Sequence, residues 1–481
     1  MQPNYPFRPQ RVSLFYGWII VIVTTIGILM SIPGQTAGVS VFTDPLLEAT
    51  GLSRLHLSNA YLVGTLTSGL LLPFGGVLID RLGARIVVIG ASVWLALTLV
   101  YLSWCDRLVA MIVNLLNLES SLTVAFMLLA IGFVNLRFSG QGMLTMVSRT
   151  TLGKWFDRKR GRVSGTAGIF ISFGFSGAPL LLSLLIDTFG WRGAWLCLSV
   201  VVGFGMTAIG WLFYRDNPEE CGLQMDGEIL QFERSATTEP PEQQGGTPEN
   251  FEAPRVADPG QRSSNSNSST PASSLPEPFH PISTTRDFTR AEALRTLAFW
   301  AVTLALASQA LTITGITFHI VDIGTSAGLT RTQTVALFLP IAIFSTLTGY
   351  LIGILSDRAK LKFLFLGMMV VEALGIVSMA HLDSSVMRIV AIAGLGMSGG
   401  CFGTLSTVSM PRYFGRRHLG AIAGVQMMSL VIASAIGPSL LALFRQVFDS
   451  YQLGLYLCAA IPLTIILPLW LSGNPQDSYS S

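Results

Sequence analysis

Gly76-Val77-Leu78-Ile79-Asp80-Arg81-Leu82-Gly83-Ala84-Arg85 is a short charged turn between two long apolar segments, residues 58–79 and 86–104. Each segment has about 20 residues, the length that an α-helix needs to cross about 30 Å of hydrocarbon. The glycine in the middle of the turn permits a sharp reversal of the chain. We therefore expect this turn at a membrane surface, where it joins the second and third of several membrane-spanning helices.

The composition is that of a protein embedded in a membrane. Of the 481 residues, 51% are hydrophobic and 12% are charged, whereas soluble proteins carry about twice that charged fraction. The five cysteines lack the spacing of a metal site or a disulfide framework. The sequence also lacks a phosphate-binding loop and a nucleophile motif. We therefore expect no enzymatic activity, no cofactor, no metal and no nucleic-acid partner.

Twelve apolar segments of about 19–25 residues predict twelve membrane-spanning helices. They are residues 16–38, 58–79, 86–104, 122–146, 163–186, 194–214, 296–318, 332–355, 363–382, 387–409, 421–443 and 453–472. The first is too long for the core of a cleaved signal peptide, so we expect it to remain as a helix. The segments lack the alternation of a membrane β-barrel, so the predicted fold class is all-α.

The positive charges are unevenly divided between the two sides of the predicted helices. The loops that follow even-numbered spans carry 14 Lys and Arg, and the opposite loops carry 6. Arg149 is counted in the first group, in the loop after the fourth span. Because basic loops stay in the cytoplasm, both termini are expected there. The predicted location is the plasma (inner) membrane.

Residues 215–293 divide the chain into two halves, 1–214 and 294–481, with six predicted spans each. Within this linker, residues 234–285 are rich in Pro, Ser, Asn, Gln and Glu and have few large apolar side chains. Such a segment buries too little surface to offset its ordering entropy, which predicts a largely disordered cytoplasmic linker. Thr289 and Glu292 have the spacing of a capping box, which predicts a short surface helix before the seventh span.

The two halves repeat each other in sequence. Gly353-Ile354-Leu355-Ser356-Asp357-Arg358 matches the segment from Gly76 to Arg81 at an offset of 277. Three further pairs share an offset of 259: Gly161 with Gly420, Gly165 with Gly424, and Pro179 with Pro438. A parallel duplication of this kind predicts two pseudo-symmetric six-helix bundles.

The pattern G-x-x-x-D-R-x-G-x-R between the second and third spans closely resembles the signature loop of the major facilitator superfamily. The resemblance implies the twelve-helix fold of that family and the transport of a small solute by alternating access. In that family the aspartate meets the start of span eleven when the cytoplasmic side is closed, and a carboxylate at a helix N-terminus is a stabilising contact. The implied gating residues are Gly76, Asp80, Arg81, Gly83, Arg85, Asp357, Arg358 and Gly420. Lys360 replaces the second glycine of the repeated motif, so we expect the second contact to be the weaker one.

Arg137 is the main candidate for binding the solute. It lies within the fourth span, where a buried guanidinium is costly unless it faces a cavity or an anion. Gln141 shares its helix face, and an Arg followed by Gln-Gly resembles the span-four motif of the family. The forked donors of Arg137 suit a carboxylate. The alternative is a structural contact with a neighbouring helix.

Four further polar residues lie in or near the predicted spans. Gln35, Asn59 and Gln309 belong to spans one, two and seven, which the family uses around its cavity; each could contact the solute or bond to another helix. Glu372 is the only acidic residue well inside a span. It is a candidate for proton coupling, with a structural role as the alternative.

Several short stretches resemble the monocarboxylate-porter-like and oxalate/formate-antiporter-like groups, among them Tyr16-Gly17-Trp18 and Phe189-Gly190-Trp191-Arg192. Spans one and eight, however, lack the charged residues that such carriers use. The resemblance implies a secondary active transporter in the lipid bilayer, a symporter or antiporter, with a uniporter as the alternative. We expect a monomer. The preferred solute is an organic anion such as a monocarboxylate. The alternatives are an exporter of amphipathic compounds and a membrane sensor that does not transport.

Overall fold

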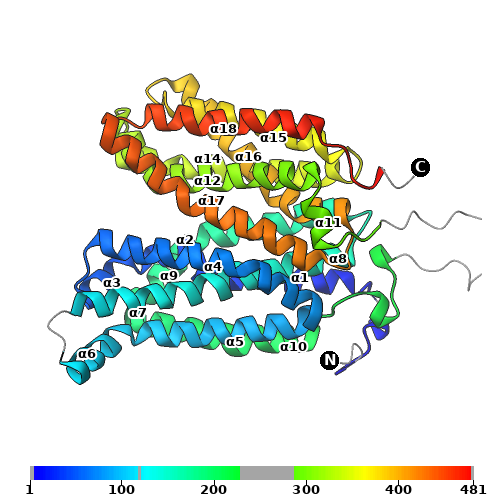
Figure 1. Ribbon diagram of the computed structural model, residues 1–481, viewed down its shortest axis with the longest axis horizontal. Helices are drawn as coiled ribbons and strands as arrows, with labels where there is room; N and C mark the ends of the chain where they lie inside the picture. The colour runs from blue at the N-terminus through cyan, green and yellow to red at the C-terminus, as the bar shows by residue number, and fades with distance from the viewer. Residues whose placement is uncertain (1–4, 13, 118–120, 228–285, 478–481) are drawn as a thin grey trace, which may run out of the picture. The chain divides into compact units, whose positions relative to one another are not determined.

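The computed structural model describes residues 5–12, 14–117, 121–227 and 286–477, and all regular structure in these ranges is helical (Figure 1). The α-helices of the first half are α1 (Gly17–Met30), α2 (Thr36–Val41), α3 (Thr43–Thr50), α4 (Arg54–Leu82), α5 (Ala84–Ser103), α6 (Cys105–Leu116), α7 (Ser121–Leu136), α8 (Thr145–Trp155), α9 (Arg160–Val200) and α10 (Thr207–Phe213). Those of the second half are α11 (Arg290–Leu294), α12 (Leu297–Ser326), α13 (Arg331–Ala336), α14 (Phe338–Ser356), α15 (Leu361–Met379), α16 (Ser385–Phe414), α17 (Leu419–Phe448) and α18 (Gln452–Leu471). Two π-helical segments, η3 (Arg137–Leu144) and η4 (Val201–Met206), continue α7 into α8 and α9 into α10.

The described residues contain the twelve predicted spans. Eleven helical stretches are long and apolar enough to cross a membrane, and the longest, Arg160–Phe213, has 54 residues. This stretch is two helices, because Gly190 has φ 69° and ψ 165° and interrupts α9. A positive φ of this kind favours glycine. The fifth and sixth spans therefore meet at Gly190, which confirms the all-α fold with twelve spans.

The first span is less regular than the sequence predicts. Its helix α1 ends at Met30 and is followed by the short 3-10 helix η2 (Ile32–Gly34) and then by α2. Pro33 has no backbone N–H and cannot continue an α-helix in its interior. This break exposes backbone carbonyl groups to side chains of neighbouring helices.

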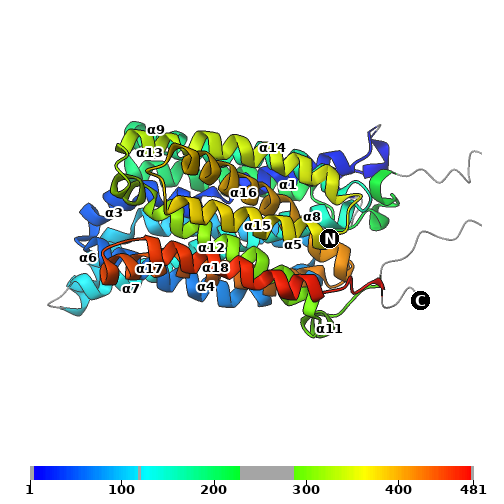
Figure 2. The same cartoon turned by 90° about the horizontal axis from the view of Figure 1, so that it is seen from above.

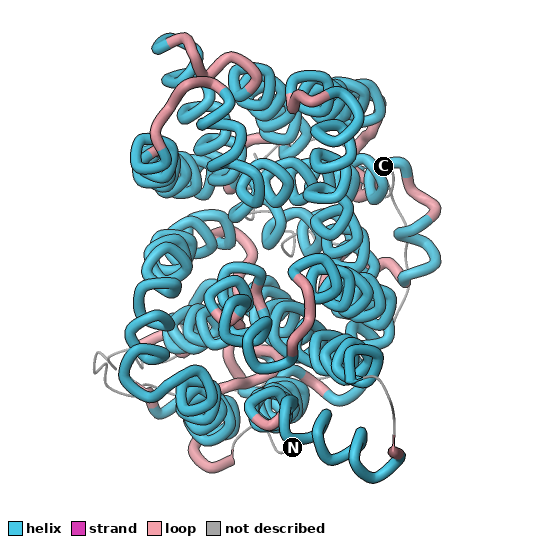
Figure 3. Tube along the Cα trace, turned by 90° about the vertical axis from the view of Figure 1, so that its left-hand side faces the viewer, coloured by secondary structure: helices cyan, strands magenta, loops and turns pink. Residues whose placement is uncertain are grey.

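The helices form two bundles that follow the two halves of the sequence. Helices α1 to α10 make one bundle and α12 to α18 make the other, and the end-on view shows the two groups of helices separately (Figures 1 and 3). Each bundle has its own buried apolar core. The sequence prediction for residues 234–285 lies outside the described residues.

Two pairs of helices make the largest contacts between the bundles, α4 with α17 and α9 with α14 (Figures 1 and 2). Glycines allow both crossings. A Cβ atom on Gly76 would lie 2.1 Å from the carbonyl oxygen of Gly420, and one on Gly161 would lie 2.2 Å from that of Gly353. These four glycines are partners in the sequence repeat, so the two crossings are pseudo-symmetric copies. A larger residue at either crossing would force the helices apart.

Helix α6, between the third and fourth spans, was not expected from the sequence. Val109 is buried against the bundle, whereas Met111, Leu115 and Leu116 are exposed. An amphipathic helix beside the ends of two spans is typical of a segment that lies in the membrane interface. The short ion pair between Asp106 and Arg192 holds it to the helix after Gly190.

Candidate functional site: carboxylate contacts and a small cavity between the bundles

Asp80 ties the last turn of α4 to the beginning of α17. Its Oδ1 accepts a hydrogen bond from the N–H of Gly420 at 2.9 Å, and its Oδ2 accepts one from Ala421 at 2.7 Å. The first N–H groups of a helix have no partner within the helix and carry its positive dipole end. Lys154 Nζ lies 3.9 Å from Asp80 Oδ1 and adds positive charge. The carboxylate therefore links the two bundles.

Asp357 makes the equivalent contact in the second repeat. Its oxygens accept hydrogen bonds from the N–H groups of Gly161 at 2.6 Å and Arg162 at 3.1 Å, in the first turn of α9. Burial raises the pKa of the Asp357 carboxyl, and these two N–H groups act in the opposite direction. The expected weakness of this second contact is not visible, because its hydrogen bonds are as short as those of Asp80.

The other residues of the signature loop occupy different surroundings. Gly83 has φ 83° and turns the chain between α4 and α5. Arg81 and Arg358 are exposed. Arg85 is buried, and its guanidinium donates to the carbonyl of Trp211. Arg85 therefore fastens α5 to α10 within the first bundle.

The described ends of the linker add a second layer of contacts near the Asp357 and Asp80 contacts, just before α9 and α17. The Asp226 carboxylate accepts hydrogen bonds from the backbone N–H groups of residues 157–159, just before α9. The Asp287 carboxylate accepts them from Arg416 and Arg417, just before α17. Residues 157 and 158 correspond to 416 and 417 at the repeat offset of 259, so the two caps are equivalent. In addition, Arg416 pairs with Glu219 at 2.8 Å.

Arg137 lies wholly within the first bundle and is 2% exposed. Its Nη1 donates to the carbonyl oxygen of Gly34 at 3.0 Å and approaches Thr36 Oγ1 at 3.4 Å. The guanidinium carbon lies 5.2 Å from the centre of the Tyr61 ring, a cation–π distance. Among the described residues no acidic side chain pairs with it. The break after α1 thus supplies the acceptor that this buried charge needs.

The other predicted solute contacts are dispersed. Gln35 donates to Ser31 Oγ at 3.0 Å and approaches Thr145 Oγ1 at 3.4 Å, which joins the first and fourth spans. Gln141 is partly buried in η3, and Asn59 is exposed near the start of α4. Gln309 is buried in α12, in the second bundle. The structure therefore does not bring these residues and Arg137 into one cluster.

Glu372 is fully buried between α15 and α12. Its Oε1 accepts hydrogen bonds from Ser308 Oγ at 2.9 Å and Thr312 Oγ1 at 3.0 Å. Its second oxygen has no hydrogen-bond partner among the described residues, and no cationic side chain there pairs with it. A carboxylate without a cation at membrane depth is costly, and a bound proton removes that cost.

Arg149 is the residue that sequence reasoning missed. The prediction placed it in a cytoplasmic loop after residue 146, which is wrong, because α8 continues to Trp155. Its guanidinium donates a short hydrogen bond to Ser406 Oγ of α16, in the other bundle. The polar run around Arg149 resembles a loop, and the signal in favour of a helix was that no Pro or Gly occurs between residues 143 and 152.

Arg149 lines a small cavity between the bundles, beside the gate. The cavity has a volume of about 30 Å³. Its lining comes from α8, α16 and α17: Met146, Arg149, Thr150, Ser406, Thr407, Met410, Pro411, Leu419, Ala423, Gln426, Met427 and Leu430. Five of the lining residues have polar side chains, namely Arg149, Thr150, Ser406, Thr407 and Gln426, and the remainder are apolar.

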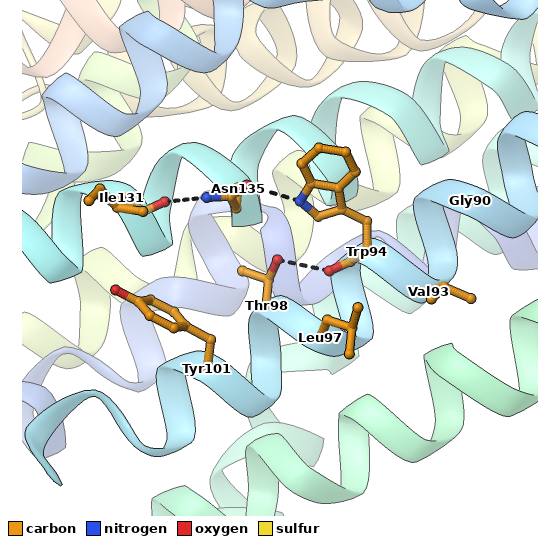
Figure 4. A pocket seen from close by; sticks show the side chains of 8 residues that line it. All are labelled: Gly90, Val93, Trp94, Leu97, Thr98, Tyr101, Ile131 and Asn135. Atoms are coloured by element: carbon orange, nitrogen blue, oxygen red, sulfur yellow. Dashed lines mark hydrogen bonds between the residues drawn. The ribbon is translucent and has the colours of Figure 1, made fainter. Parts of the chain in front are cut away.

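A larger pocket of about 510 Å³ lies elsewhere, between α5 and α7 (Figure 4). Trp94 Nε1 donates to Asn135 Oδ1 at 2.9 Å across it. Trp94, Leu97 and Ile131 are about half exposed, so this pocket opens on the outside of the first bundle. Its mostly apolar lining is suited to contact with lipid, and neither Asp80 nor Asp357 belongs to that lining.

Two bundles related by an internal repeat and joined at glycine crossings, with carboxylates that cap helices of the opposite bundle, define a two-bundle α-helical membrane protein. The chain belongs to the Major Facilitator Superfamily, whose family model matches residues 23–438. It is therefore an integral membrane protein of this superfamily.

Relatives with curated descriptions are monocarboxylate transporters. The chain is 26% identical over 208 residues to monocarboxylate transporter 2 of Rattus norvegicus, a match that covers 41% of this chain and 36% of the relative. It is 28% identical over 193 residues to the Homo sapiens protein of the same name, covering 38% and 34%. The matches thus span about a third of the length of these relatives.

Solved structures with the same fold span nearly the whole chain. The human organic anion transporter MFSD10 (TETRAN) aligns with a TM-score of 0.59 at 13% identity, covering 94% of this chain and 99% of the other. The proton:xylose symporter XylE, bound to 6-bromo-6-deoxy-D-glucose, aligns with a TM-score of 0.62 at 13% identity, covering 97% and 99%. At these identities the likeness concerns the fold alone.

Proposed function

We propose that the protein is a secondary carrier that moves a small organic anion across the membrane by alternating access. One observation carries the proposal: the two repeat-related carboxylates, Asp80 and Asp357, each cap the first turn of a helix in the opposite bundle. Contacts of this kind close one end of the interface and are lost when the bundles separate there. The site is thus suited to a reversible gate.

The closed end is proposed to face the cytoplasm. Lys and Arg are concentrated in the loops at this end, which favours retention on the cytoplasmic side. The proposed state therefore has its cytoplasmic gate closed. It follows that Asp80, Asp357 and the glycine crossings control access from the cytoplasm.

An anionic solute is favoured by the charges at membrane depth. Arg137 and Arg149 are the two guanidinium groups within the fourth span, and neither has an acidic partner among the described residues. Such charges attract anions into a cavity with low-dielectric walls. The names of the curated relatives agree with a monocarboxylate. We infer that Arg137 orders the broken first span and contributes positive potential.

Proton coupling is proposed to involve Glu372. Its burial, its two hydroxyl donors and the absence of a cationic partner among the described residues suit a carboxyl that binds and releases a proton. Ser308 and Thr312 belong to α12, so a change at Glu372 would act directly on the seventh span.

Flux into proteoliposomes tests the carrier function. We expect labelled propionate or benzoate to accumulate in vesicles that contain the wild-type protein. Asp80→Asn should slow turnover more than it weakens binding, because it weakens the gate contact and leaves the cavity intact. Binding of these anions without flux would indicate a sensor. Flux of amphipathic compounds without flux of carboxylates would favour the exporter.

A further inference from the structure

We propose that Arg149 and Gln426 form a carboxylate-binding site between the bundles, beside the gate, and that the Ser406 hydroxyl fills this site while the gate is closed. The proposal rests on the proposed function and adds the position and chemistry of the solute's charged group. The three residues lie on α8, α17 and α16, so the site includes both bundles.

Arg149 provides a positive charge that lacks an anion. It is partly buried, and within the described part of the chain its hydrogen-bond acceptor is Ser406 Oγ. That oxygen also donates to the carbonyl of Gly403 at 3.1 Å. A guanidinium has five N–H donors and is always charged, so one neutral hydroxyl leaves most of its capacity unused. The site therefore favours a negatively charged ligand with several acceptor positions.

Gln426, which lines the same cavity, independently points to an acceptor there. It is 5% exposed and lines the cavity, and its side-chain nitrogen has no hydrogen-bond partner among the described residues. A buried amide donor without a partner is destabilising. A carboxylate has two oxygens and about four lone-pair positions, so it can accept from Arg149 and Gln426 together.

The rest of the lining limits the size and character of the solute. Met146, Met410, Met427 and Leu430 surround the polar group, which suits a ligand with one charged end and a compact apolar body. A dianion would leave its second charge against these side chains at a high cost. The proposed class of solute is therefore a small monocarboxylate.

The closed gate excludes this solute. A cavity of about 30 Å³ has room for about two water molecules, which is too little for a carboxylate with its carbon chain. The hydrogen bond from Arg149 to Ser406 crosses from one bundle to the other and must break when they separate at this end. Arg149 is then free to bind the anion, and Ser406 no longer competes for it.

Protection of Arg149 from chemical modification tests the proposal. The full-length protein in nanodiscs is treated with phenylglyoxal, and modification at each arginine is measured by mass spectrometry. Propionate and benzoate should protect Arg149, whereas the neutral propionamide and benzamide should not. The exposed Arg295 is the internal control and should react equally in all samples. Asp80→Asn should increase the reactivity of Arg149 in the absence of anions, because it weakens the closed gate.

Variants provide a second measurement, the increase in melting temperature that each carboxylate produces. Arg149→Gln should abolish this increase, Arg295→Gln should retain it, and Gln426→Leu should weaken the apparent affinity about tenfold. Equal reactivity of Arg149 with and without carboxylate, in both the wild type and Asp80→Asn, would overturn the site. So would a carboxylate response that persists in Arg149→Gln. Carboxylate flux that does not depend on Arg149 would refute this site but support the carrier function. Protection of Arg149 by carboxylates without any carboxylate flux would support the site but refute the carrier function.

Discussion

The two guanidinium groups of the fourth span are stabilised in different ways. A positive charge at membrane depth is costly unless neutral hydrogen-bond acceptors or a bound anion compensate it. Arg137 has the carbonyl of Gly34 and the ring of Tyr61. Arg149 has one serine hydroxyl from the opposite bundle. The first arrangement is a fixed part of one bundle, and the second changes whenever the bundles move.

Arg137→Ala should therefore affect folding before it affects transport. The change removes a charge-assisted hydrogen bond from a buried carbonyl, worth about 1.5–3 kcal/mol, and leaves a void beside Tyr61. We expect a lower melting temperature and less protein in the membrane, with flux per folded molecule reduced much less. Arg137→Lys, which retains the charge, is the matched control. Normal stability with no flux would instead make Arg137 a solute contact, the role first suggested by the sequence.

Glu372→Gln should separate proton coupling from solute movement. The amide is close in shape to a protonated carboxyl and cannot exchange a proton, so a pH gradient should no longer drive uptake. Exchange of solute between the two sides should continue at about the wild-type rate. Counterflow and gradient-driven uptake in the same vesicles measure both properties. Undiminished gradient-driven uptake in this variant would remove Glu372 from the coupling mechanism.

Sequence reasoning was informative where a residue has a local pattern and weak where its partners are distant. The resemblance of the loop around Asp80 to the signature motif of the superfamily led to Gly420, and the contact agrees with the preference of a carboxylate for a helix N-terminus. The acceptor of Arg137 depends on a helix break at Pro33, and the position of Arg149 depends on how far α8 continues. Neither hydrophobicity nor charge counting contains that information.

At the scale of elements, the two ends of the linker are equivalent caps for the loops that begin α9 and α17. Asp226 and Asp287 lie on opposite sides of the 228–285 segment, yet their targets correspond in the repeat. The predicted capping box is confirmed, since Thr289 and Glu292 bond reciprocally at the start of α11. The segment that follows residue 285 therefore holds the loop before α17 through Asp287.

Asp287→Ala should loosen the start of α17 and thereby weaken the contact that α17 makes with Asp80. Loss of a carboxylate that caps backbone N–H groups costs about 1 kcal/mol. We expect faster hydrogen exchange at residues 415–421, measured by mass spectrometry, with little change around residues 157–163. Asp226→Ala should instead give faster hydrogen exchange around residues 157–163, with little change at residues 415–421. Equal exchange in both regions for both variants would show that the caps do not act locally.

The fourth span was read too short because the residues after position 146 are mostly polar. The span count could be predicted because about 20 apolar residues are needed per crossing. The boundary at residue 146 could not, because the polar residues of α8 have partners inside the protein: Ser148 contacts Tyr214 in the same bundle, and Arg149 contacts Ser406 in the other bundle.

At the scale of the whole molecule, the glycine crossings make closure dependent on backbone contact. Gly76→Ala places a methyl group where the Gly420 carbonyl oxygen lies. The protein should then be unable to adopt the closed-gate conformation, and the open-gate conformation should dominate. Gly90→Ala is the matched control, because a Cβ atom there meets nothing within 4 Å. Greater phenylglyoxal reactivity of Arg149 in Gly76→Ala than in Gly90→Ala is the expected result. Equal reactivity would mean that the crossing does not limit closure.

The distance between the bundles at the gate tests the central claim most directly. Spin labels at the exposed positions 81 and 417, with the five native cysteines replaced, report that distance in nanodiscs by double electron–electron resonance. We predict a short distance in the wild type and a second, longer one that grows in the Asp80→Asn, Asp357→Asn double variant. A single distance, unchanged by the double substitution and by carboxylates, would contradict a gate that opens by separation of the bundles.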